Sequence, residues 1–269
     1  MNADNIKLIC VYLRLSAVAK MWLWKVTRKL RSLAVFSLAL CCFSLIILTQ
    51  VNTPAASFPP VPNSWPPPQV HPLPPMANWQ DSTDSGDYFD QIKPPNVGHL
   101  LWSKFPIQVY VARPADASKS EEWVGAVLGV VREWGVYLPL EVVDNSEVAD
   151  IRILRQAPPL RQGLLRSRSG ESVYELYTSR DGDKTILSHR FSVYLNPNQV
   201  GKYIAAMARH ELGHALGIWG HSLMETDVLY YSQVRNPPPI SARDINTLKR
   251  VYEQQTRLGF ELIPQIPGG

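Results

Sequence analysis

A short run of histidines constrains this chain more than any other feature of its sequence. Three of its six histidines lie between positions 210 and 221, and His210 and His214 are four residues apart with Glu211 between them. On an α-helix, such residues lie one turn apart and within about 40° of each other around the axis. Two neutral imidazoles so placed suit Zn²⁺. The sequence therefore predicts a helix over 200–216 that carries two metal ligands.

The neighbouring residues indicate how this helix is placed. The arc opposite the histidines is apolar and should face the core; it consists of Ile204, Ala208, Leu212 and Ala215. Gly213 inside the helix costs about 1 kcal/mol relative to Ala, which indicates close packing there. Gly217 favours the end of the helix, after which the chain can return His221 toward the same point. Glu211 can reach a metal-bound water without being a ligand.

This pattern resembles a known zinc signature. The run HELGHALG followed by Gly-His-Ser is similar to HExxHxxGxxH of the metzincin clan, and most closely to the matrixins. The resemblance covers about residues 97–255 and includes the strand Ala149–Ile151. It implies a zinc endopeptidase with an α+β fold, whose cleft runs between an upper sheet and a lower subdomain. By position, His210 and His214 would ligate one catalytic zinc, and Glu211 would be the general base.

The third ligand departs from the matrixin spacing. That spacing places it at position 220, which is Gly220 here, and the histidine follows one residue later at His221. Because the Gly-His-Ser run is intact and Gly217 and Gly220 make a bulge sterically cheap, we expect a one-residue insertion with His221 as the ligand. Asp227 is the alternative third ligand.

Other departures concern the surroundings of the zinc. Leu229 stands where the matrixins have the methionine of the Met-turn, a change of similar volume. Tyr230 would then lie near the zinc and the pocket for the residue after the scissile bond, or be a core tyrosine. Matrixin zymogens often keep the zinc inactive with a cysteine of the prodomain. We do not expect such a cysteine switch here, because no cysteine follows Cys42. His189 and His99 lack the partners of a second, structural zinc site and should be surface or packing residues; calcium is possible, but no site is visible.

The rest of the chain predicts a mixed sheet with few helices. Alternating or β-branched runs predict five strands, at 105–111, 140–143, 149–154, 174–178 and 191–195. The last two are separated by a turn at 181–183. A capping box, Ser118 to Glu121, predicts the start of a helix with Trp123, Val127, Val131 and Trp134 in the core. A second cap, Ser241 to Asp244, predicts a C-terminal helix with Ile245, Leu248 and Tyr252 on one side. The expected class is α+β, a metzincin-like domain with a mixed twisted sheet.

Composition divides the chain into four parts. Residues 1–32 carry seven basic side chains and one acid, and residues 33–48 form an apolar run. We expect 1–50 to be a basic leader with a signal peptide or signal anchor, the apolar segment being 33–49. Ten prolines between Pro54 and Pro75 indicate an extended linker over 51–96. The catalytic domain is expected at 97–256, followed by a tail at 257–269.

Charge and topology limit the partners. The basic residues are concentrated in the leader, so the net charge of +4 does not indicate nucleic-acid binding. We expect an extracytoplasmic monomer, secreted or anchored by 33–49, that hydrolyses peptide bonds in protein or peptide substrates by zinc-activated water with Glu211 as base. It would touch the membrane only through an uncleaved N-terminal segment. The alternatives are a catalytically inactive zinc-binding extracytoplasmic domain and a membrane-tethered interaction protein.

Overall fold

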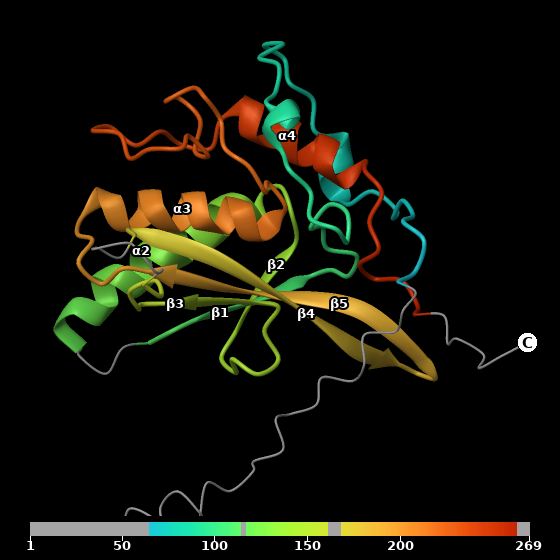
Figure 1. The fold of residues 1–269 in the computed structure, drawn as a ribbon. Helices are drawn as coiled ribbons and strands as arrows, with labels where there is room; N and C mark the ends of the chain where they lie inside the picture. The colour runs from blue at the N-terminus through green and yellow to red at the C-terminus, as the bar shows by residue number, and fades with distance from the viewer. Residues whose placement is uncertain (1–64, 114–116, 161–167, 263–269) are drawn as a thin grey trace, which may run out of the picture. The chain divides into compact units, whose positions relative to one another are not determined.

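The computed structural model describes residues 65–113, 117–160 and 168–262 (Figure 1). The basic leader, the apolar segment 33–49 and the first part of the proline-rich linker lie outside the described residues, so the signal peptide or anchor stays a prediction. Within the described ranges, no helix is both long and apolar enough to cross a bilayer.

The centre of the fold is a mixed five-stranded sheet with strand order β2-β1-β3-β5-β4. The strands are β1 (Ile107–Val111), β2 (Leu140–Val143), β3 (Ile151–Leu154), β4 (Gly170–Asp181) and β5 (Lys184–Leu195). β1 pairs in parallel with β2 and β3, β3 pairs in parallel with β5, and β4 closes one edge antiparallel to β5. The predicted α+β class with a mixed sheet is therefore confirmed.

Three α-helices accompany the sheet: α2 (Ala117–Gly135), α3 (Lys202–Leu216) and α4 (Ala242–Tyr252). α2 and α3 pack beside each other and against the sheet, and α4 lies beyond them (Figure 1). Alternate residues of β1, Ile107, Val109 and Val111, are buried beneath the helices. The predicted core residues of α2 are also buried, namely Trp123, Val127, Val131 and Trp134.

Two helix starts test the capping predictions. At α4 the prediction is confirmed: Ser241 is the N-cap and exchanges the two hydrogen bonds of a capping box with Asp244. At α2 it is wrong, because the helix already includes Ala117, which places Ser118 inside the helix. Alanine has the highest helix propensity, which favours this longer helix.

The hairpin β4–β5 is much longer than the strands predicted at 174–178 and 191–195. Each strand has 12 residues, and they are joined by the two-residue turn Gly182-Asp183, where Gly182 has a φ of 61°. The full length of the two strands was not predicted, because the outer half of the hairpin is polar and lacks the hydrophobic pattern used to identify strands. The predicted tail helps to hold this half: Gly259 donates to Leu187, and Leu262 donates to Thr185. Residues 257–262 therefore belong to the packed domain.

Residues 65–96, which the proline content assigned to a linker, pack against the domain. They include η1 (Pro75–Asn78) and η2 (Phe89–Gln91), and Met76, Tyr88 and Ile92 are buried. The Tyr88 hydroxyl donates to Asp244 at 2.5 Å. Apolar side chains spaced between the prolines provide the buried surface, so the packed part of the chain extends N-terminal to Val97 as far as Trp65.

Candidate metal centre

Helix α3 presents two histidines because its opposite face is anchored in the core. Ile204, Ala208, Leu212 and Ala215 are all buried, as predicted. A Cβ at Gly213 would lie 2.7 Å from Leu229 Cδ2 and 3.1 Å from Trp134 Cζ2. This glycine therefore lets Leu229 and Trp134 approach the helix backbone between the two histidines, as the close-packing prediction required.

The turn after α3 returns the third histidine to the other two. Gly217 ends the helix with a φ of 135°, a conformation that favours glycine. Gly220 lies so close to the Gln91 carbonyl that a side chain at this position would clash. Lys93 N–H donates to the Trp219 carbonyl at 3.2 Å. The turn from Gly217 to His221 is thus made possible by two glycines and is packed against the segment before Val97.

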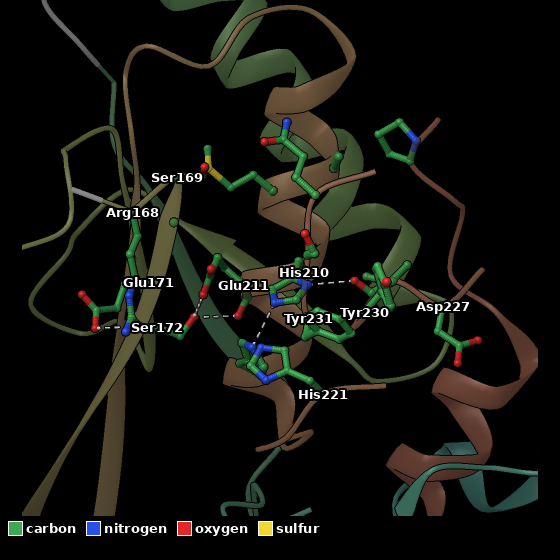
Figure 2. A pocket seen from close by; sticks show the side chains of 18 of the residues that line it. Arg168, Ser169, Glu171, Ser172, His210, Glu211, His221, Asp227, Tyr230 and Tyr231 are labelled. Atoms are coloured by element: carbon green, nitrogen blue, oxygen red, sulfur yellow. Dashed lines mark hydrogen bonds and ion pairs between the residues drawn. The ribbon is translucent and has the colours of Figure 1, made fainter. Parts of the chain in front are cut away.

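The three histidines form one cluster, of which Figure 2 labels His210 and His221. One ring nitrogen from each of His210, His214 and His221 can be chosen so that all three lie within 4.8 Å of one another. The Nε2 atoms of His210 and His214 are 3.1 Å apart. Across the part of the chain that the structure describes, no fourth His, Cys, Asp or Glu joins this group. The cluster could therefore hold a metal ion through three protein ligands.

Backbone carbonyls orient two of the rings. Nδ1 of His210 lies 2.8 Å from the Val228 carbonyl, and Nδ1 of His214 lies 2.7 Å from the Ile218 carbonyl. Since a carbonyl can only accept, Nδ1 carries the hydrogen in both rings and Nε2 keeps its lone pair for a metal. Burial lowers the pKa of His210 to about 4 and that of His214 well below its usual value. Neutral imidazoles of this kind are compatible with zinc, although they do not identify it.

Glu211 lies between α3 and β4, buried with 8% of its surface exposed. The Ser172 hydroxyl lies 2.8 Å from its Oε2. The pKa of Glu211 is raised to about 7, chiefly by burial and to a smaller extent by the Glu171 carboxylate, against the opposing effect of the Ser172 hydrogen bond. The carboxyl group can therefore gain or lose a proton near neutral pH, as a general base and acid requires.

Asp227, the alternative third ligand, does not join the cluster. It is 1% exposed and accepts hydrogen bonds from Ser222 Oγ at 2.5 Å, Ser241 Oγ at 2.8 Å and Arg243 Nε at 3.1 Å. Figure 2 shows its carboxylate set apart from the histidines. The expectation of Asp227 as a ligand is therefore wrong, because this carboxylate already holds the loop after His221 to α4.

The loop that Asp227 holds also supports the cluster. Leu229 is fully buried against Gly213. Leucine therefore fills the core at the position that we compared with the methionine of the matrixin Met-turn. Val228 presents its carbonyl to His210, while its N–H donates to Asp244 Oδ2 at 3.0 Å. Tyr230 is half-buried and lines the pocket, which favours a site residue over a core tyrosine.

A pocket of about 850 Å³ opens over the histidines and Glu211. Apolar residues contribute to its lining, among them Tyr203, Ala206, Met207, Val234, Pro237 and Pro238. Sequence analysis missed Gly170, Ser172 and Trp219, which also line it. No local pattern identifies Gly170 and Ser172, because they meet Glu211 only through the packing of β4 on α3.

The two remaining candidate histidines stay outside the cluster. His189 is 4% exposed, stacks on Trp102 with ring centroids 4.0 Å apart, and is a packing residue. His99 is half-buried and stacks on Phe89 at 5.7 Å. Neither belongs to a second metal group in the described ranges, where the three clustered histidines form the single group found.

Comparison with known proteins adds no family to this geometry. No protein-family model matches the chain, and no curated protein matches it. The three histidines, Glu211 and the pocket around them therefore carry the functional inference.

Proposed function

We propose that this protein is an exported, zinc-dependent endopeptidase of the metzincin clan, similar to the matrixins. The observation that carries the proposal is the convergence of His210, His214 and His221 beside the buried carboxyl group of Glu211 in one pocket. Three neutral nitrogen ligands, with no fourth protein ligand among the residues that the structure describes, leave a coordination position for water or substrate, whereas structural zinc sites usually have four protein ligands. This favours an enzyme over the alternative of an inactive zinc-binding domain.

The residues divide the work of hydrolysis. When bound, zinc would lower the pKa of a water molecule and polarise the scissile carbonyl group. His210, His214 and His221 hold the ion, and the carbonyls of Val228 and Ile218 fix two of their rings. Glu211 takes a proton from the attacking water and returns it to the leaving amine, a role that suits a pKa of about 7.

The edge of the sheet supports a peptide substrate. Among the described strands, β4 pairs only with β5, so one side of its backbone is left for another strand. Its residues from Gly170 to Tyr174 line the pocket. An extended peptide can add to such an edge through main-chain hydrogen bonds, which would lay a scissile bond across the site whatever its side chains.

The first test uses the full-length chain. We expect one zinc ion per chain by elemental analysis, and cleavage of casein that a chelator abolishes and zinc restores. Glu211→Ala should keep the zinc and lose about 10³-fold in kcat, within the usual contribution of a positioned acid–base group. Glu175→Ala, on the exposed face of β4, is the control and should be unaffected. Cleavage that persists in Glu211→Ala would contradict the assigned role.

A further inference from the structure

The first residues of β4 surround the carboxyl group of Glu211. Ser172, 39 residues before Glu211, is buried, and its hydroxyl lies 2.8 Å from Oε2 and 2.8 Å from the backbone carbonyl of Glu211. In Figure 2 the two side chains point toward each other from β4 and α3. Because the hydroxyl carries a single hydrogen, it donates to one of these two acceptors or shares the hydrogen between them, and both the carboxylate and the helix turn that carries it lie within its reach.

Gly170 forms the other side of this enclosure. A Cβ at this position would lie 2.8 Å from both Cγ and Oε1 of Glu211, and 2.9 Å from Met207 Cγ. The glutamate side chain thus fills the space that the missing side chain leaves, while Ser172 engages its second oxygen. Contact on one side and a hydrogen bond on the other restrict the rotation of a side chain that is otherwise flexible.

We propose that Ser172 is a positioning residue for Glu211: its hydroxyl holds Oε2 against β4, so that the carboxylate keeps one orientation beside the histidine cluster. This inference rests on the proposed function. A catalytic group must be held close to its productive geometry, and a misplacement of about 1 Å can cost on the order of 10²-fold in rate. In this role the Ser172 side chain acts through Glu211.

The competing explanation for Ser172 is structural. Its contact with the Glu211 carbonyl could serve only to fasten β4 to α3. Loss of a fastening lowers the stability of the fold, whereas loss of a positioning contact lowers kcat and leaves stability, zinc content and KM nearly unchanged. The two roles therefore differ in what a substitution changes.

The experiment compares Ser172→Ala and Ser172→Thr in the zinc-loaded full chain. Ser179→Ala is the matched control, because Ser179 lies on the same strand and bonds to Ser188 at 2.7 Å, far along the hairpin. With a fluorogenic peptide we expect Ser172→Ala to lose about tenfold in kcat, with KM within twofold and one zinc per chain. Ser172→Thr keeps the hydroxyl and should restore most of the rate. An unchanged kcat in Ser172→Ala, or a loss of kcat only in step with the melting temperature, would overturn the proposal.

A second measurement does not depend on turnover. Acetohydroxamic acid, a zinc-binding probe whose hydroxyl group can donate to a neighbouring carboxylate, is titrated by calorimetry into the zinc-loaded variants. We expect Kd to rise in Glu211→Ala and, by a smaller factor, in Ser172→Ala, with Ser179→Ala unchanged. If the wild type fails to cleave any peptide but shows this order, the proposed function fails and the role of Ser172 stands. If Ser172→Ala binds the probe as the wild type does, the role of Ser172 fails.

Discussion

Among the buried acids that line the pocket, Asp227 and Glu211 have different surroundings. Asp227, 1% exposed, accepts hydrogen bonds from two hydroxyls and from the guanidinium of Arg243. Glu211, 8% exposed, has the Ser172 hydroxyl as its donor and lines the pocket. Both line the pocket, but the donors to Asp227 come from the loop after His221 and from α4, whereas the donor to Glu211 comes from β4.

The difference separates support from chemistry. A buried carboxylate with several donors holds together the elements that donate to it. Burial raises the pKa of Glu211 to about 7 although the Ser172 hydrogen bond opposes it, so this carboxyl group can exchange a proton near neutral pH. Asp227 therefore supports the loop after His221, and Glu211 is the acid to which we assign the proposed chemistry.

The largest effect expected from this difference is on stability. Asp227→Ala removes the carboxylate that pairs with Arg243 and accepts from the hydroxyls of Ser222 and Ser241, and should lower the free energy of unfolding by about 3 kcal/mol. Glu211→Ala removes a poorly compensated buried charge and should leave that free energy nearly unchanged. Urea unfolding of the metal-free proteins measures both values. An equal loss in the two variants would break the distinction between them.

A second prediction extends the comparison from buried acids to a buried histidine, His189. Burial lowers the pKa of His189 to about 3, and its Nε2 has no hydrogen-bond partner among the described residues. The unfolded chain binds the proton near pH 6.5 and the folded chain does not, so stability is complete above that pH and is lost as the pH falls toward 3. At pH 5 this loss is about 2 kcal/mol.

His189→Phe tests that loss, because phenylalanine keeps the stacking on Trp102 and cannot take up a proton. Unfolding free energies measured at pH 7.5 and at pH 5 should fall by about 2 kcal/mol less in the variant than in the wild type. His210 and His214 titrate in both proteins and cancel in the difference. An identical fall in both would show that His189 is not held neutral by burial.

The sequence predicted the site better than it predicted the limits of the domain. Helix periodicity identifies His210, Glu211 and His214 because the contacts between them are local. Placing His221 beside the other two histidines required a prediction about the turn after the helix. The conformation of Gly217 and the close packing at Gly220 support that prediction. Ser172 could not be predicted, because it reaches Glu211 across 39 residues through the packing of a strand on a helix.

The packed segment at 65–96 was missed for a related reason. Proline content describes the local backbone, which is extended, but it does not say what the residues between the prolines contact. Tyr88 is buried because Asp244 and α4 lie beside it, and Ile92 is buried near the turn that carries Gly220. Both contacts are long-range, so composition alone placed this segment outside the domain.

The smallest predicted effect concerns how tightly the loop that Asp227 fixes is packed against α3. A Cβ at Gly213 would lie 2.7 Å from Leu229 Cδ2, so Gly213→Ala forces Leu229 and its loop outward. Overpacking costs about 1–3 kcal/mol and exceeds the gain of about 1 kcal/mol from helix propensity, which leaves a net loss of about 1 kcal/mol.

Gly125→Ala is the matched control, because a Cβ at this position of α2 has no neighbour within 4 Å, and it should stabilise the protein. Opposite signs in thermal unfolding would show a rigid support beneath the histidines. A gain in stability from both substitutions would mean that the loop yields, and the contrast between a fixed Asp227 region and a reactive Glu211 region would then have to be given up.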